Sequence, residues 1–167
     1  MIRRYSVVLC ALALTACGFH LRGSAELPFT TLNIALPESS ALRAEMARTI
    51  TSSSQTTIVD NPKEAQAVLS VLADTQTKNI LSLNSAGRVR EYELVRAFTF
   101  KVDDAAGQPL VAPSRIVMRR DITFNDDQVL SKEAEETLLW RDIQNDLLQQ
   151  LLRRLAAANL KPAEGKE

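Results

Sequence analysis

Hydrophobic and polar residues alternate most clearly over residues 88–103. A period of two is typical of a β-strand that buries one of its faces. Residues 114–125 alternate in the same way, and the turn-forming sequence 103–109 separates the two segments. The pattern therefore predicts neighbouring antiparallel strands, whose apolar positions are Tyr92, Leu94, Phe98, Phe100, Val102, Ile116, Met118, Ile122 and Phe124.

Two further segments have weaker strand patterns. Residues 31–36 alternate between apolar and polar side chains, and residues 67–77 begin apolar and end polar. Both segments are expected to be strands. In the second segment, a regular pleat puts three apolar side chains on one face of the sheet, namely Leu69, Val71 and Ala73.

Two helices are predicted from apolar residues at helical spacing. A short helix follows Ser39 or Ser40, either of which can cap it, and its apolar residues recur every four positions at Leu42, Met46 and Ile50. A helix of 28 residues is expected from Ser131, as its N-cap, to Ala158, and it would be about 42 Å long. One wide stripe of this helix is apolar, formed by Leu138, Leu139, Ile143, Leu147, Leu148, Leu151, Leu152 and Leu155.

The order strand, helix, several strands, helix predicts an α+β fold. Two helices would pack on one face of a mixed, roughly four-stranded β-sheet. In the alternative interpretation, the leucine-rich stripe docks on a partner instead of the sheet. Residues 28–160 are predicted to form a single domain, followed by a polar tail at 161–167.

The first residues of the chain are typical of a bacterial lipoprotein signal. Arg3 and Arg4 precede an apolar run of ten residues, Tyr5–Leu14, which is too short to span a bilayer as a helix. Small residues then precede Cys17, as in a lipobox. Residues 1–16 are therefore expected to be removed and Cys17 to carry N-acyl and S-diacylglycerol chains, a covalent anchor rather than a cofactor. The alternative is an ordinary signal that is cleaved elsewhere.

Composition excludes several classes of function. Removal of residues 1–16 leaves 151 residues with 18 basic and 20 acidic side chains, so binding of nucleic acid through bulk positive charge is excluded. The chain has one histidine, His20, and the cysteines Cys10 and Cys17. A metal site built from His and Cys is therefore not expected, and catalytic residues are not assigned. Residues 17–27 form a tether, on which His20 has no nucleophile or orienting acid nearby in the sequence.

Three segments resemble the LPS-assembly lipoprotein LptE family. They are Cys17-Gly18-Phe19-His20-Leu21-Arg22 after the lipobox, the turn and strand Gly87–Tyr92, and Phe124–Gln128 followed by Leu130 and Lys132. The resemblance implies two helices on a four-stranded mixed sheet. It also implies a lipoprotein that plugs and helps to assemble the β-barrel LptD. In lipoproteins of this class, a residue other than Asp after the cysteine, here Gly18, favours the outer membrane. Such a protein binds lipopolysaccharide during its delivery to the outer leaflet, and its domain lies on the periplasmic side or within the barrel lumen.

Basic side chains are the candidates for contact with lipopolysaccharide phosphates. Lys132 lies in the family motif near the start of the long helix, where backbone N–H groups favour anions. Arg88 and Arg90 follow the Gly87 turn. In the alternative interpretation, Lys132 pairs with Glu135 or Glu136, and the two arginines are charges that keep a hairpin edge soluble.

Four other features have a structural interpretation. Arg96 and Arg120 fall in the apolar phase of their strands, so each is expected at a strand end or paired with an acid such as Asp142 or Asp146. Trp140 is expected to pack between helix and sheet, with an interface anchor as the alternative. The post-cysteine motif, Phe19, His20, Leu21 and Arg22, is expected to lie against the domain or the barrel.

Two other functions compete with the one that the resemblance implies. The first is an accessory lipoprotein of another envelope transport or barrel-insertion complex that does not bind lipopolysaccharide. The second is a periplasmic hydrolase, which would need paired carboxylates or an activated nucleophile. Asp126-Asp127 is the close acidic pair near a strand end, and this sequence is more typical of a turn.

Overall fold

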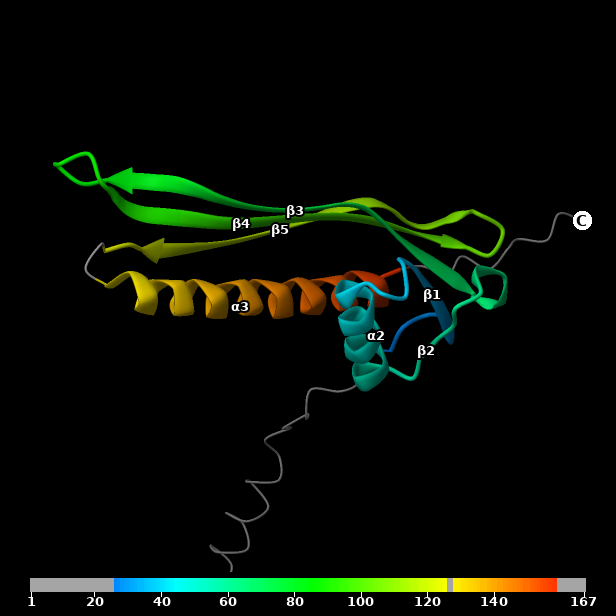
Figure 1. The fold of residues 1–167 in the computed structure, drawn as a ribbon. Helices are drawn as coiled ribbons and strands as arrows, with labels where there is room; N and C mark the ends of the chain where they lie inside the picture. The colour runs from blue at the N-terminus through cyan, green and yellow to red at the C-terminus, as the bar shows by residue number, and fades with distance from the viewer. Residues whose placement is uncertain (1–25, 126–127, 159–167) are drawn as a thin grey trace, which may run out of the picture.

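A computed structural model describes residues 26–125 and 128–158. These residues form two α-helices and a mixed sheet of five strands in the order β2-β1-β3-β4-β5 (Figure 1). The elements in chain order are β1 (Thr31–Ala35), α2 (Ala41–Ser53), β2 (Thr57–Ile58), the 3-10 turn η1 (Pro62–Glu64), β3 (Ala67–Leu83), β4 (Val89–Asp104), β5 (Pro109–Thr123) and α3 (Val129–Ala156).

The sheet combines a short parallel part with a long antiparallel part. β1 is parallel to both β2 and β3, and it pairs with β3 only from Leu32↔Ala67 to Ala35↔Ser70. β3, β4 and β5 form a three-stranded antiparallel meander. The three long strands therefore extend well beyond the end of β1, as Figure 1 shows.

The core lies between the sheet and the two helices, which cover the same face (Figure 1). α3 runs along the meander, and α2 lies beside the C-terminal half of α3. Alternate residues of β4 from Leu94 to Val102 are buried on the face toward α3, and so is one stripe of α3. The largest buried side chains include Phe98, Phe100, Leu94, Ile143 and Leu147. Burial of this one face explains why the sequence alternates there.

The predicted fold class is confirmed, with one strand more than expected. β2 has two residues, too few for any periodic pattern. β3 also continues past residue 77 to Leu83. From Leu72 onward nearly every residue of β3 is exposed, so burial imposes no alternation of apolar and polar residues there.

The N-cap of the short helix is confirmed and that of the long helix is wrong. The hydroxyl of Ser40 accepts a hydrogen bond from the backbone N–H of Arg43 at 3.3 Å. The long helix has the expected 28 residues but begins two residues earlier, at Val129, after Gln128 as N-cap. The Ser131 hydroxyl donates to the carbonyl of Gln128, which places Ser131 inside the first turn.

A β-bulge changes the face on which Ala73 lies. Val71 is opposite Phe100 in the core, whereas Ala73 is opposite Thr99, because Leu72 is the extra residue. A bulge of one residue moves all later residues of a strand to the other face. Ala73 therefore lies on the face away from the helices, and the expectation that it shares a face with Leu69 is wrong.

Some expectations fall on residues outside the described part of the chain. They concern the signal segment 1–16, Cys17 with its tether, Asp126-Asp127 and the tail 161–167. Neither helix of the described residues is both long and apolar enough to cross a membrane.

Candidate functional site

Three segments meet at one end of the elongated domain, on the left of Figure 1: the β3–β4 hairpin, the end of β5 and the start of α3. The backbone N–H of Phe124, just after β5, donates to the carbonyl of Arg90 at 2.7 Å. The Tyr92 and Phe124 rings are in edge-to-face contact with centroids 5.5 Å apart. These contacts fix the first residues of β4 against the segment that leads into α3.

Lys132 lies at this end and is already engaged. Its Nζ is 3.0 Å from Thr123 Oγ1 and 2.8 Å from Glu135 Oε2. The Lys132 side chain is 16% exposed and that of Glu135 is 47% exposed. The alternative interpretation from the sequence, an ion pair with Glu135, is therefore what the structure contains. Glu136 pairs with Lys78 instead.

Arg88 and Arg90 are exposed where the β3–β4 hairpin enters β4. Gly87 adopts a positive φ of 75°, a conformation that favours glycine. The Asn84 side chain accepts hydrogen bonds from the N–H groups of Ala86 and Arg88. The turn thus has a defined geometry. It holds Arg88, which precedes Arg90 by two residues, at the same end of the domain as Lys132.

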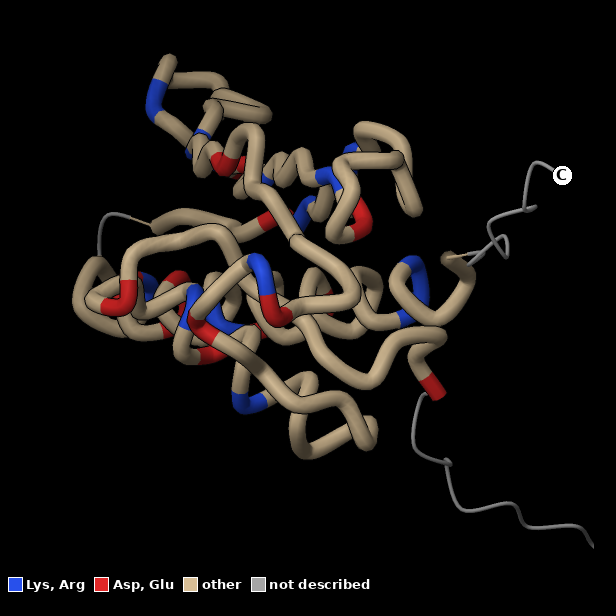
Figure 2. Tube along the Cα trace, turned by 90° about the vertical axis from the view of Figure 1, so that its right-hand side faces the viewer, with Lys and Arg blue, Asp and Glu red and all other residues tan. Residues whose placement is uncertain are grey.

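Arg88, Arg90 and Lys132 lie at the same end of a domain of mixed charge. Lysines and arginines are interspersed with acids along the sheet and the helices (Figure 2). An anion would therefore meet positive charge at particular places rather than over a whole side of the domain.

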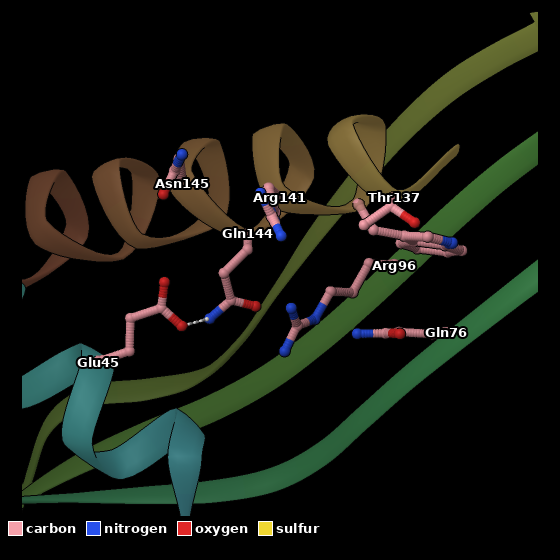
Figure 3. A pocket seen from close by; sticks show the side chains of 8 residues that line it. Glu45, Gln76, Arg96, Thr137, Arg141, Gln144 and Asn145 are labelled. Carbon is pink, nitrogen blue, oxygen red and sulfur yellow. Dashed lines mark hydrogen bonds between the residues drawn. The ribbon is translucent and has the colours of Figure 1, made fainter. Parts of the chain in front are cut away.

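A second concave feature lies between the helices and the sheet (Figure 3). It is a cavity of about 640 Å³, in the size range of small-molecule sites. The side chains that line it come from α2, β3, β4 and α3, namely Glu45, Gln76, Arg96, Thr137, Trp140, Arg141, Gln144 and Asn145. Glu45 and Gln144 join the two helices through a 2.8 Å hydrogen bond.

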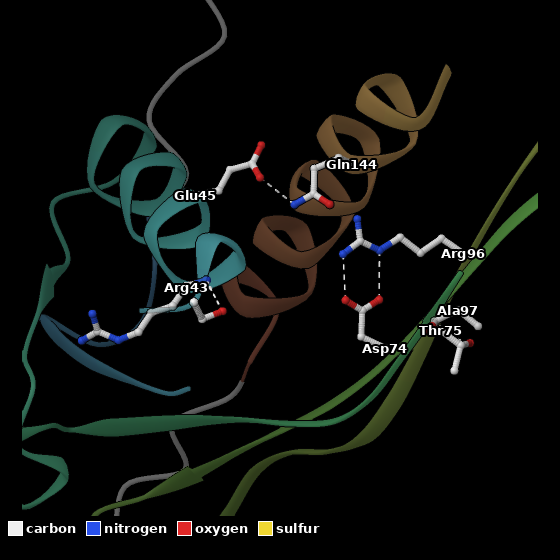
Figure 4. A network of polar contacts seen from close by, with 8 residues as sticks. Arg43, Glu45, Asp74, Thr75, Arg96, Ala97 and Gln144 are labelled. Atoms are coloured by element: carbon white, nitrogen blue, oxygen red, sulfur yellow. Dashed lines mark hydrogen bonds and ion pairs between the residues drawn. The ribbon is translucent and has the colours of Figure 1, made fainter. Parts of the chain in front are cut away.

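Arg96 is the buried charge of this cavity. Its Nε and Nη2 donate to the two carboxylate oxygens of Asp74 at 2.9 and 2.8 Å (Figure 4). The residue is 4% exposed. Pairing with an acid was expected, but neither Asp142 nor Asp146 is the partner of Arg96. Asp146 instead pairs with Arg120, which is one of the pairings expected from the sequence. Both arginines lie within their strands rather than at strand ends.

Trp140 packs partly against the core, as expected, and also lines the cavity. Its Nε1–H donates to Glu136 Oε1 at 3.3 Å. Sequence reasoning did not identify the cavity, because its residues come from four elements and form no linear motif. The signal for it in the sequence was indirect. Arg96 occupies a strand position at which the alternation predicts an apolar residue, and a charge buried there requires a carboxylate nearby.

Within residues 26–125 and 128–158, no three His, Cys, Asp or Glu side chains are grouped so as to hold a metal ion. The Asp126-Asp127 pair lies outside these ranges.

The sequence matches a model of the family described as LptE: Lipopolysaccharide-assembly over residues 29–155. It is 28% identical to the LPS-assembly lipoprotein LptE of Pectobacterium atrosepticum, covering 94% of this chain and 87% of that protein. It is 30% identical to the LPS-assembly lipoprotein LptE of Yersinia enterocolitica, covering 93% and 77%. These names describe assembly lipoproteins rather than enzymes.

Among solved structures, the fold is similar to that of an uncharacterized lipoprotein B from Nitrosomonas europaea. The TM-score is 0.74 at 35% identity, and the match covers 84% of this chain and 91% of that one.

Proposed function

Because the chain belongs to the LptE family of lipopolysaccharide-assembly proteins, we propose that it acts in lipopolysaccharide assembly at the outer membrane. Its acylated Cys17 anchors the domain, which plugs an LptD-type β-barrel and assists the assembly of that barrel. It also binds lipopolysaccharide during delivery to the outer leaflet. None of these roles requires a catalytic residue or a resident cofactor.

The plug role is supported by the shape and rigidity of the domain. Long strands and a 28-residue helix run side by side over one continuous core, which makes an elongated wedge (Figure 1). A partner that binds only the folded form of a barrel stabilises that form by mass action. A rigid wedge is suited to this task because it loses little conformational entropy on binding.

The lipid contact is supported by one observation above the others, the meeting of β4, β5 and α3 at a single end. The Phe124–Arg90 hydrogen bond and the Lys132–Thr123 contact join the segments that carry these cations. Lys and Arg side chains form charge-assisted hydrogen bonds with phosphates such as those of lipid A. In the proposed complex, a phosphate replaces Glu135 as the partner of Lys132, while Arg88 and Arg90 contact further anionic groups.

Lipopolysaccharide binding by the purified lipoprotein tests the contact. Arg88→Glu and Lys132→Asp are each expected to lower affinity by about tenfold, equivalent to one charge-assisted hydrogen bond. Arg115→Glu and Lys101→Asp are the matched charge reversals, because both residues lie on the opposite face of the sheet. Unchanged thermal unfolding excludes a folding defect, and equal affinity in all four variants would remove Arg88 and Lys132 from the site.

A detergent pull-down from outer membranes, followed by mass spectrometry, tests the partner. An LptD-type barrel is expected to co-purify with the lipoprotein. Recovery of a different transporter or insertion complex, with no affinity for lipopolysaccharide, would favour the alternative of an accessory lipoprotein.

A further inference from the structure

The long strand β3 has one edge that the described residues leave largely unpaired. β1 covers this edge only as far as Ser70, whereas β4 pairs with the opposite edge along the whole of β3. Beyond Ser70, the outward N–H and C=O groups of β3 therefore have no strand partner within the described part of the chain. Such a row of groups is a template for another strand.

The middle of this edge is regular. Bulges interrupt the β3–β4 register near Leu72 and near Leu81, but Ala73–Ile80 is in continuous register with Thr99–Tyr92. Eight regular residues extend over about 27 Å, which exceeds the length of a typical strand. The segment contains no proline, so it can offer an unbroken ladder of hydrogen bonds.

The regular segment is polar and locally neutral, and apolar side chains are exposed at or beyond its two ends. Half of the eight large hydrophobic side chains exposed on the described surface lie on β3, and they are Leu72, Ile80, Leu81 and Leu83. The two charges of the regular segment are both compensated on the helix side, Asp74 by Arg96 and Lys78 by Glu136. Charge on the edge itself thus does not oppose an incoming strand.

The other long edge of the sheet, on β5, has the opposite character. It contains Pro109 and Pro113, which cannot donate to a ladder. It also carries Arg115 and Asp121, besides Arg119 and Arg120, which pair with Glu93 and Asp146. Four charged residues on this edge, against two in the regular segment of β3, oppose pairing with another strand. One long edge of the same sheet is protected and the other is open, so the openness of β3 is a specific feature of that strand.

We propose that Ala73–Ile80 of β3 docks an extended strand of a partner polypeptide by β-augmentation. Only another backbone complements an alternating row of N–H and C=O groups, which selects a polypeptide over a glycolipid. The occupant is an extended polypeptide segment with an acidic or polar side chain directed toward the helix side of the edge. This inference does not depend on the proposed lipopolysaccharide contact.

The cavity supplies a place for the side chains of the occupant. Gln76 of β3, Glu45 of α2 and Trp140 of α3 line it on the helix side of the open edge. Side chains of an added strand alternate between the two faces, so every second one points to the helix side, and those beside Gln76 face this cavity. Arg141 is exposed at its wall and has no ion-pair partner among the residues described. The occupant therefore places an acidic or polar side chain there.

Site-specific photocrosslinking tests the proposal with the full lipid-anchored protein in its own cells. A photoreactive residue is placed in turn at Thr75, Thr77 and Asn79. These positions lie on the uncovered face, opposite Ala97, Val95 and Glu93. The matched controls on the same face of β5 are Arg115, Val117 and Arg119.

The expected adducts join the three β3 positions to one segment of one partner protein. The attached residue in that segment shifts by two for each step along β3, and the β5 controls do not label the segment. Adducts to lipid only, to a second copy of this chain, to scattered partner residues, or no adducts at all would each overturn the proposal.

Backbone amide exchange, resolved residue by residue, provides a second test. Within Ala73–Ile80, amides that face β4 exchange slowly in the purified lipoprotein and in isolated outer membranes alike. The alternate, outward amides are expected to slow at least about tenfold in membranes, because a new ladder protects them. Uniform slowing of both sets, as a lipid or helix cover would give, or no slowing, contradicts β-augmentation.

Discussion

Arg96 and Asp74 form a bidentate ion pair between β4 and β3, on the face of the sheet that α3 covers. Arg96 has a side chain that is 5% exposed, while that of Asp74 is 25% exposed. The pair allows a full charge to lie next to the apolar core. It also neutralises Asp74 on the strand whose outer edge is open.

Replacement of Asp74 by Asn is expected to destabilise the domain by about 3 kcal/mol, near the lower limit for breaking a buried ion pair, because Asp74 retains some contact with water. The remaining Arg96 would be buried without a carboxylate. Equilibrium unfolding in urea, with the free energy of unfolding extrapolated to water, measures the loss.

The double replacement Arg96→Met and Asp74→Leu provides the control. Removal of both charges leaves no unpaired group, so the double variant is expected within about 1 kcal/mol of the wild type. Arg96→Met alone and Asp74→Leu alone, together with this double variant, complete a double-mutant cycle. A double variant as unstable as Asp74→Asn would show that packing around Arg96, rather than its pairing, maintains the fold.

The sequence predicted the elements of this fold in which burial of one face dictates the order of apolar and polar residues. Leu94, Phe98 and Phe100 alternate because α3 covers one side of β4. Arg96 was recognisable as anomalous for the same reason. Its partner was not predictable, because Asp74 lies 22 residues away on a strand whose pairing register depends on the bulge at Leu72.

The open edge and the cavity have no signature in the sequence. Residues 78–83, apart from the half-buried Ser82, are exposed, so their apolar and polar residues follow no period. The cavity joins Glu45, Gln76 and Trp140 from three elements, and only the tertiary packing of α2 beside α3 brings them together. Lys132, Arg88 and Arg90 were candidates from their motifs, but that their segments meet at one end was not predicted. The ion pair between Lys132 and Glu135 was one of the alternatives for Lys132.

Leu147→Ala is expected to destabilise the domain by about 3 kcal/mol, as for other large-to-small replacements in a core. Leu147 is fully buried where α3 meets the sheet. Leu138→Ala is the matched control, because Leu138 is on the same helix but 57% exposed, and its cost should stay below about 0.5 kcal/mol. Urea unfolding of both variants makes the comparison. Equal losses would contradict docking of this part of α3 on the sheet.

Glu135→Gln is expected to raise the affinity for lipopolysaccharide by about two- to fivefold, the range that corresponds to one partly exposed ion pair. The substitution releases Lys132 from the carboxylate 2.8 Å away and also removes a negative charge that opposes the lipid phosphates. Glu133→Gln removes a charge from the same turn region, but Glu133 has no ion pair with Lys132. It therefore separates the release of Lys132 from the change in net charge.

Binding titrations at two salt concentrations distinguish these contributions. A gain with Glu135→Gln that exceeds the gain with Glu133→Gln supports competition between Glu135 and the lipid for Lys132. Equal gains would mean that only the overall charge of this end matters. Lower affinity in Glu135→Gln would indicate that the ion pair orients Lys132 for the lipid.

Gly87→Ala is expected to destabilise the domain by about 1 kcal/mol, the cost of a left-handed backbone conformation for alanine. Gly87 has a φ of 75°, and an added Cβ would meet no atom within 4 Å, so the cost comes from the backbone alone. Gly107 in the β4–β5 turn is a close match, with a φ of 81° and equally open space. Both substitutions should therefore lower stability equally, whereas only Gly87→Ala moves the turn that presents Arg88. Thermal unfolding together with lipopolysaccharide titration separates the two effects. Equal loss of stability in both variants, with weaker binding in Gly87→Ala alone, supports Arg88 as a ligand. The same binding affinity in both variants argues against this role of Arg88.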